Sequence, residues 1–395
     1  MATRGWGGSI ALAIGVGAGA AAAQLGVAYG LGIMIWPAAT DPAGERAWLA
    51  SLAWTTWIAA TATVLGAVVA DRLSPGQPGA APPRRRTGSV ARVPAGPMAT
   101  TAWRLVLALT AAVGGLLTVA LVAVPARAAH RPGALAPQMV AGGYAVVGVV
   151  VGVLVALAAL SARAIAANTV LTTAYVWLLG TGSALFGLAA AGTPATAQLG
   201  AWHFGAGHLL RQTYSLPGAA LMLGAALVIG VAAAAPAIRR GDNPVGVAIS
   251  GAFGPLLVSS AYFFAAPPLS GAGGDEQLSA YAIAPYAALI GLFASVVLVA
   301  LAAQRAQRLA AEAAVAGAEP AAPVPAPRSE ESLPEDAYAP ARAYEPAEQP
   351  ALVTNPGPMP LWPTQPDPSP DESSAEEVTE ARPAGKGFVR RLGRR

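Results

Sequence analysis

Few side chains in the apolar part of this chain are able to do chemistry, and the most informative are two amides and a proline. Gln24 and Asn168 lie within long apolar segments, where a buried amide needs hydrogen-bond partners. Gly254 and Pro255 lie near the middle of another such segment, and a proline there removes a backbone donor and kinks a helix. Broken helices line the substrate sites of many transporters. These four residues therefore predict either clamps between helices or the lining of a cavity, and both interpretations stay open.

Other kinds of chemistry lack the residues they need. The chain has no cysteine, which excludes disulfides, thiolate catalysis and cysteine metal sites. His203 and His208 are five residues apart, a spacing that does not place both on one helical face, and the only other histidine is His130. Neither an HExxH motif nor a P-loop occurs, and Asp275 and Glu276 stand without a partner for a hydrolytic pair. We therefore predict no catalytic, metal-binding or cofactor-binding residues and expect no enzymatic activity.

The composition of the chain indicates which kind of structural element holds these residues. Charged residues are 11% of the chain, against about 25% in soluble domains. They are also unevenly spread, because residues 1–303 hold 20 of the 44 charges and residues 304–395 hold the other 24. A soluble domain of this size could not cover its surface with so few charges, whereas a surface in contact with lipid has no such need.

Eight segments are long and apolar enough to cross a bilayer, which takes about 20 residues each. We predict an all-α, polytopic transmembrane bundle over residues 1–303, with spans near 9–36, 48–70, 105–125, 138–160, 165–190, 216–236, 245–266 and 281–303. None of these segments contains Asp, Glu, Lys, Arg or His. That absence argues against a proton-coupled carrier, a pump or an intramembrane protease, which usually carry ionisable groups inside their spans.

Arginine distribution predicts the orientation. With the N-terminus inside, 12 arginines fall on the cytoplasmic side and four on the other, as the positive-inside rule requires. The cytoplasmic set is Arg4, Arg72, Arg84, Arg85, Arg86, Arg92, Arg104, Arg163, Arg239, Arg240, Arg305 and Arg308, and the opposite set is Arg46, Arg127, Arg131 and Arg211. We expect a plasma-membrane protein with both termini in the cytoplasm. Abundant Ala, Gly, Pro and Arg, with a single Lys, suggest a bacterium with GC-rich codons.

Two polar segments belong to the cytoplasmic side. Loop 71–104 is rich in Pro, Gly and Arg and should be a flexible connector, and residues 304–395 should form a disordered tail, acidic and Pro-rich and then basic at its end. Seven basic residues are candidates for contact with anionic phospholipid headgroups: Arg84, Arg85, Arg86, Arg390, Arg391, Arg394 and Arg395. Equally, the arginines of the loop are only a topology signal and those of the tail are only a solvated end. The tail could also bind cytoplasmic proteins. The pI near 9.6 follows from these arginines, and we expect no nucleic-acid partner.

Internal spacing suggests a relation between the two halves of the bundle. Tyr144 and Arg163 bracket one span and Tyr286 and Arg305 another, with the same 19-residue separation and an offset of 142 residues. Spans 1–4 and 5–8 would then be parallel repeats, although apolar segments also resemble one another by chance. Three GxxxG pairs favour close helix packing: Gly15 with Gly19, Gly26 with Gly30, and Gly148 with Gly152.

Two classes of function remain at this stage. The first is a non-enzymatic envelope anchor or organiser whose loop 71–104 and tail serve as docking segments in the cytoplasm. The second is a transporter or lipid-handling permease, or a membrane subunit of a larger complex, with a cavity around Gln24, Asn168 and Pro255. A water-accessible cavity at mid-membrane depth would favour the second class, and a solid bundle packed through Gly and Ala would favour the first.

Overall fold

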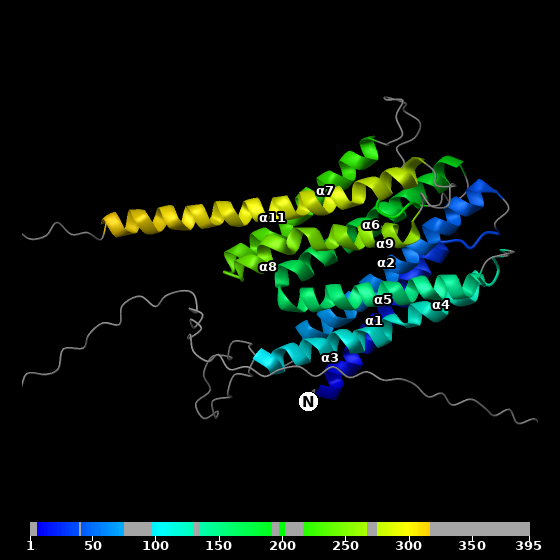
Figure 1. Cartoon of the computed structure of the whole chain (residues 1–395), viewed down its shortest axis with the longest axis horizontal. Coiled ribbons are helices and arrows are strands. Elements are labelled where there is room, and N and C mark those ends of the chain that lie inside the picture. The colour runs from blue at the N-terminus through cyan, green and yellow to red at the C-terminus, as the bar shows by residue number, and fades with distance from the viewer. Residues whose placement is uncertain are drawn as a thin grey trace, which may run out of the picture. The chain divides into compact units, whose positions relative to one another are not determined.

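The described part of the protein is all-helical, without strands, and contains eight helices that are long and apolar enough to span a membrane, which confirms the predicted all-α, polytopic bundle. The computed structural model describes residues 6–38, 41–74, 97–129, 131, 135–191, 197–201, 216–266 and 275–316 (Figure 1). Most of loop 71–104 and nearly all of the predicted tail lie outside these residues. The helices are α1 (Trp6–Gly30), α2 (Pro42–Leu73), α3 (Pro97–Gly115), α4 (Leu117–Ala126), α5 (Pro137–Ser161), α6 (Arg163–Ala191), α7 (Leu216–Arg239), α8 (Pro244–Ile249), η1 (Ser250–Ala252), α9 (Phe253–Ala265) and α11 (Asp275–Ala316).

Two spans are broken within the membrane region. α3 and α4 together form the third span, and α8, η1 and α9 form the seventh. The fourth span is α5, the fifth α6, the sixth α7 and the eighth α11. Thus the third span of each half of the chain is the interrupted one.

The two halves pack by the same rule. Within spans 1–4, the first span contacts the second and third, and the fourth contacts the second and third. The second and third also touch each other. The same five pairings occur among spans 5–8, and no comparable packing joins the first and fourth span of either half within the described residues. The halves meet where α2 and α5 pack against α6 and α9. The packing therefore relates spans 1–4 to spans 5–8 in the same order along the chain as the 142-residue offset between the two pairs of tyrosine and arginine does.

Helix ends differ from the predicted spans at several places, and two of these differences have a clear local cause. α1 ends at Gly30 rather than near residue 36, because Gly32 adopts a positive φ of 66° that turns the chain out of the helix. α11 continues to Ala316, 13 residues past the boundary at 303 where we placed the start of the tail. That extension is rich in alanine, the best helix former, and places Arg308 four residues before Glu312.

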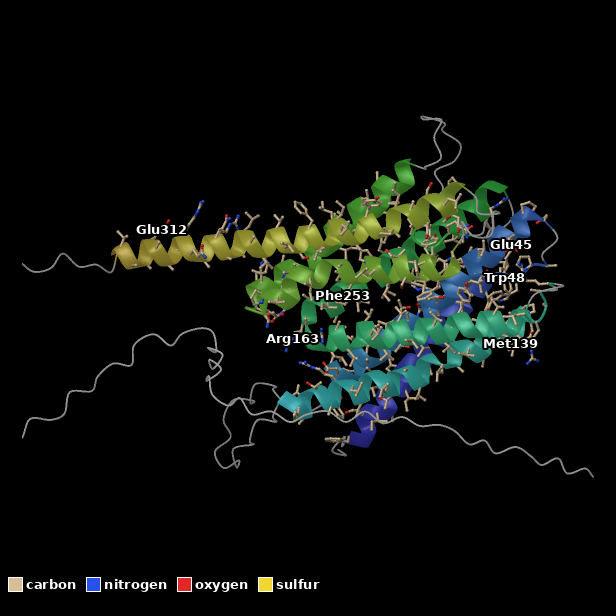
Figure 2. All side chains as sticks on the ribbon, viewed as in Figure 1. Glu45, Trp48, Met139, Arg163, Phe253 and Glu312 are labelled. Carbon is tan, nitrogen blue, oxygen red and sulfur yellow. The ribbon has the colours of Figure 1, made fainter. Side chains whose placement is uncertain are left out.

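The two ends of the bundle differ in charge. The end where α1 begins and α11 finishes is called the Arg-rich end here, and its described arginines are Arg72, Arg104, Arg163, Arg239, Arg240, Arg305 and Arg308. Figure 2 shows Arg163 and Glu312 toward this end and Glu45 and Met139 toward the other. At the opposite end Arg131 pairs with Glu45, and its guanidinium lies 4.6 Å from the ring centre of Trp48. That contact ties the start of α2 to the segment after α4.

The core of the bundle is α2, and it is packed through backbone contacts. In its apolar part 89% of the residues are buried, against 22–50% for the other spans. Gly148 and Gly152 of α5 lie against the carbonyl oxygens of Thr56 and Ala60 of α2. A Cβ atom at either glycine would be only 2.4 Å or 2.7 Å from that oxygen. Only residues without a side chain permit this approach, which maximises van der Waals contact where lipid supplies no hydrophobic drive for association.

The other two glycine pairs do not contribute to this packing. Gly15, Gly19, Gly26 and Gly30 of α1 are exposed, and an added Cβ at any of them would meet nothing within 4 Å. The GxxxG pattern therefore identified a packed surface on α5 and an outward-facing surface on α1. The pattern alone does not distinguish the two, because exposure depends on which neighbours surround the helix.

Replacing Gly148 by Ala should lower the thermal stability of the purified protein in detergent. The new methyl group would collide with the Thr56 carbonyl and force α5 away from α2, at a cost of about 1–3 kcal/mol. Gly143→Ala on the same helix is the matched control, because a Cβ there meets nothing within 4 Å and helix propensity improves by up to about 1 kcal/mol. Equal melting temperatures for the two variants would contradict this account of the core.

Candidate functional site

Three polar side chains of the candidate site lie on one face of α6. Asn168, Thr172 and Tyr175 are separated by four and three residues, so they lie on the same side of the helix. Asn168 is 0% exposed and Thr172 is 4% exposed. The face is directed at α9, which packs against α6.

The seventh span is interrupted directly opposite this face. Pro255 has no backbone N–H and its ring crowds the carbonyl of Gly251, so the helix leaves α-geometry for one 3-10 turn over Ser250–Ala252 before α9 begins. The break thus lies just before the Gly254–Pro255 pair at which the sequence predicts a kink.

Side chains from two neighbouring helices bind the backbone groups at this break. The amide of Gly254 donates to Oδ1 of Asn168 on α6 at 2.8 Å, and the amide of Gly251 donates to the hydroxyl of Ser295 on α11 at 3.3 Å. A backbone N–H left unpaired in the hydrocarbon layer would cost several kcal/mol. Asn168 and Ser295 therefore hold the broken span from both sides.

Glycine lets these helices come close enough for that bonding. A Cβ at Gly254 would lie 2.0 Å from the Thr172 hydroxyl and 2.8 Å from Oδ1 of Asn168. A Cβ at Gly251 would lie 1.8 Å from the carbonyl oxygen of Gly291. The hydroxyl of Thr172 and Oδ1 of Asn168 therefore both lie next to the position that a Cβ of residue 254 would occupy.

A small cavity adjoins this cluster. Its volume is about 20 Å³, and it is lined by Thr172, Tyr175, Val176, Gly200, Met222, Ala225, Ala226, Ile229, Pro255, Val258 and Ala287. These residues come from α6, α7, α9, α11 and the short buried segment 197–201. Almost all of the lining is apolar, and its polar side chains are those of Thr172 and Tyr175.

Three polar atoms of this cluster are buried without a hydrogen-bond partner: Nδ2 of Asn168, Oγ1 of Thr172 and the hydroxyl of Tyr175. Most buried polar groups in proteins are paired, so three orphans beside one cavity mark an unusual place. Oxygen and nitrogen atoms of this kind can bind a small neutral molecule. None carries a charge, and the described residues contain no group of His, Cys, Asp and Glu able to hold a metal ion.

Gln24 belongs to a different network, which joins the two halves. Its Oε1 accepts hydrogen bonds from the Thr61 hydroxyl at 3.0 Å and from Nε1 of Trp177 at 2.9 Å. The ring centres of Trp177 and Trp54 are 5.2 Å apart, and Nε1 of Trp54 donates to the Ala197 carbonyl at 2.9 Å. This chain of contacts runs from α1 through α2 and α6 to segment 197–201.

The structure thus separates the residues that the sequence grouped. Asn168 and Gly254 are hydrogen-bonded to each other and Pro255 lines the cavity, whereas Gln24 lies in the network between the halves. Arg84, Arg85, Arg86, Arg390, Arg391, Arg394 and Arg395 lie outside the described residues, so their predicted contact with anionic lipid stays a prediction.

Sequence reasoning missed Thr172 and Tyr175 as members of the site. The signal that could have found them is their spacing from Asn168, which places all three on one helical face. Ser295 was also overlooked, because a single serine in an apolar helix usually bonds to its own backbone. Here its hydroxyl instead lies closest to the Ala248 carbonyl of the seventh span, at 2.5 Å, and next to the Leu292 carbonyl of its own helix, at 2.9 Å, while it accepts from the Gly251 amide.

The architecture and the site together define a class, that of multi-pass membrane proteins made of eight apolar helices. No family model, curated protein or solved structure matches the chain. The function is therefore argued from the geometry alone.

Replacing Asn168 by Leu should destabilise the bundle by about 1–3 kcal/mol, because it leaves the Gly254 amide buried without an acceptor. The measurement is the melting temperature in detergent. Thr169→Val is the control, since Thr169 is the next residue, equally buried, and its hydroxyl bonds only to the Ile165 carbonyl of its own helix. If Asn168→Leu melts at or above the temperature of Thr169→Val, the clamp on the broken span is not a stabilising contact.

Proposed function

We propose that this protein is a non-enzymatic membrane scaffold, in which a rigid eight-helix bundle holds a helical arm and the following tail in the cytoplasm for partner proteins. The observation that carries this proposal is the solid, backbone-packed core around α2. The arm is the part of α11 that continues beyond the predicted end of the last span.

The packing of the core supports a static role. Helix backbones touch at Gly148 against Thr56, at Gly114 against Ile14 and at Gly251 against Gly291, in both halves of the bundle. Surfaces that fit this closely have little freedom to slide, because interiors at native density change shape only by repacking. The cavity beside Thr172 is also far below the 300–1,000 Å³ typical of sites for larger ligands.

The arm supports a role in holding partners. α11 has 42 residues, which makes it about 63 Å long, against a hydrocarbon core of about 30 Å. Its residues 303–315 are all exposed. Ala306, Leu309 and Ala313 lie on one apolar side of the arm, while Arg305, Arg308 and Glu312 form a charged side. A helix of this kind presents a surface to a cytoplasmic protein without needing to fold on contact.

Orientation and location are part of the same proposal. Seven described arginines lie at the Arg-rich end and three at the opposite end, which supports a cytoplasmic Arg-rich end in a bacterial plasma membrane. Arginines of loop 71–104 and of the tail would then face anionic phospholipid headgroups.

A second candidate function is that of a permease for a small neutral solute. It is favoured by the broken seventh span, which lies beside the cavity and the unpaired groups of Thr172 and Tyr175. A permease would have to open this cavity further, and the charge-free spans restrict it to solutes that move without proton coupling.

Solute flux and complementation distinguish the two candidates. A scaffold leaves the permeability of proteoliposomes to water, ammonia and glycerol at the level of empty liposomes. In cells lacking the chain, a variant that ends at Ala303 should fail to restore the wild-type phenotype, whereas Asn168→Leu should restore it wherever the variant still reaches the membrane. Flux above the empty-liposome level, or full rescue by the variant ending at Ala303, would reject the scaffold.

The absence of cysteine makes the orientation directly measurable. Gln307→Cys on the arm and Ala43→Cys at the opposite end both introduce an exposed thiol. In intact cells a membrane-impermeant maleimide should label Cys at position 43 and reach position 307 only after the membrane is opened. The reverse labelling pattern would overturn the proposed orientation while leaving the bundle itself unaffected.

A further inference from the structure

We propose that copies of this chain pack against one another in the membrane, with the side of α7 and α11 in one copy seated on the side of α1, α3 and α4 in the next. The inference does not rest on the scaffold function, because it concerns only how the bundle associates. It is argued from the contact between the two halves of a single chain, which joins surfaces of the same two kinds.

The contact between the halves joins unlike faces. The second and fourth spans of the first half, α2 and α5, pack against the first and third spans of the second half, α6 and α9. The corresponding faces left over are α7 with α11 in the second half and α1 with α3 and α4 in the first, and they lie on opposite sides of the bundle (Figure 1). Apart from the hydrogen bond between Gln24 and Trp177, these leftover helices make no comparable contact with the opposite half within the described residues. An interface between unlike faces can repeat from one copy to the next.

A pair of tyrosines marks the covered face and its uncovered counterpart. The hydroxyl of Tyr144 on α5 donates to the Phe264 carbonyl at the end of α9, across the boundary between the halves, at 2.7 Å. Tyr286 on α11 follows 142 residues later, is 59% exposed and has no hydrogen-bond partner among the described residues. Leu289 and Phe293 continue the same side of α11 and are 60% and 62% exposed. This side of α11 therefore has the residues for a contact that the single chain does not make.

Two glycine contacts relate the receiving faces of the two halves. Gly254 of α9 lies against Asn168 of α6 and the residue one turn later. Gly114 of α3 lies against Ile14 of α1 and, again, the residue one turn later. In each half the glycine belongs to the third span and its contacts belong to the first, so α1 corresponds to α6 and the span made of α3 and α4 corresponds to α9.

This correspondence identifies the residue opposite Tyr286 in the next copy. Phe264 follows Gly254 by ten residues, and Val124 of α4 follows Gly114 by ten residues. Val124 is 60% exposed. Since Tyr144 lies at the Phe264 carbonyl, its counterpart Tyr286 is placed next to Val124 of the neighbouring copy.

The outward glycines of α1 fit the same arrangement. Gly180 of α6 lies against the ring of Trp54 on α2. Gly26 of α1 follows Ile14 by twelve residues, as Gly180 follows Asn168. Gly26 is exposed and a Cβ there would meet nothing within 4 Å, so it leaves room for an apolar side chain from α7 of the next copy.

The test is cross-linking between full-length chains in the membrane, which the absence of native cysteine makes specific. Two copies with different tags are produced together, one with Tyr286→Cys and the other with Val124→Cys, and treated with a short membrane-permeant bis-maleimide. We expect a product of twice the 39.2 kDa mass of the chain that carries both tags. The same substitution in both copies should lose this product, because like faces do not meet.

The matched control combines Tyr286→Cys with Gly143→Cys. Gly143 is exposed and directly precedes Tyr144, the counterpart of Tyr286, so the two thiols lie at similar depth, but α5 is outside the proposed contact. Each thiol is first shown to react with a simple maleimide. Equal product from the control pair, no product from the pair at 286 and 124, or as much product from Tyr286→Cys with itself would each overturn the proposal.

A bulky residue at Gly26 tests the second part of the contact. Gly26→Leu in both copies should remove the cross-link between positions 286 and 124 and leave the melting temperature in detergent unchanged, because its side chain would point away from its own bundle. Gly143→Leu, at another exposed glycine, should leave the cross-link intact. A cross-link that persists in Gly26→Leu at the level of Gly143→Leu would overturn the proposed arrangement.

Discussion

Close contact between helix backbones is the constraint on which this structure depends. Lipid tails are as apolar as the helix surfaces, so burial from water gives no reason for the spans to associate once they are in the membrane. Van der Waals contact between the helices must hold the spans together instead, and two backbones come closest where one of them carries a glycine. Gly148 on the Thr56 carbonyl and Gly251 on the Gly291 carbonyl are the two clearest instances, one in each half of the bundle. The burial of α2 and the small size of the cavity both follow from this closeness.

Several polar side chains in the spans connect neighbouring helices. Gln24 joins α1 to α2 and α6, Asn168 joins α6 to α9, and the Tyr144 hydroxyl donates to the Phe264 carbonyl across the boundary between the halves. All of these bonds are neutral, so none depends on pH or on a counter-ion inside the membrane. These connections support the proposed scaffold, in which α11 extends beyond the predicted end of the last span.

Much of the fold could be predicted from the sequence, because eight apolar segments of sufficient length have few other stable arrangements in a chain so poor in charge. Pro255 also indicated the interrupted span, because proline lacks the N–H of a helical hydrogen bond whatever surrounds the helix. The break between α3 and α4 was not predicted: it follows Gly114 and Gly115, which are as permissive as many other glycines of the chain. The boundary at 303 was too early because hydropathy reports the end of the apolar stretch, whereas alanine propensity continues the helix to Ala316.

The sequence by itself determined the number of spans, the lack of charge within them and the residues able to form polar contacts. Only the tertiary structure decided which of those residues meet. Gln24 and Asn168 are equivalent amides in apolar helices, yet one bonds between the halves and the other at a helix break, since each partner comes from a helix far away in the chain. The GxxxG glycines of α1 and α5 share one motif but face opposite environments for the same reason. The packing partners of a helix determine which of its faces is buried, and the local sequence does not specify those partners.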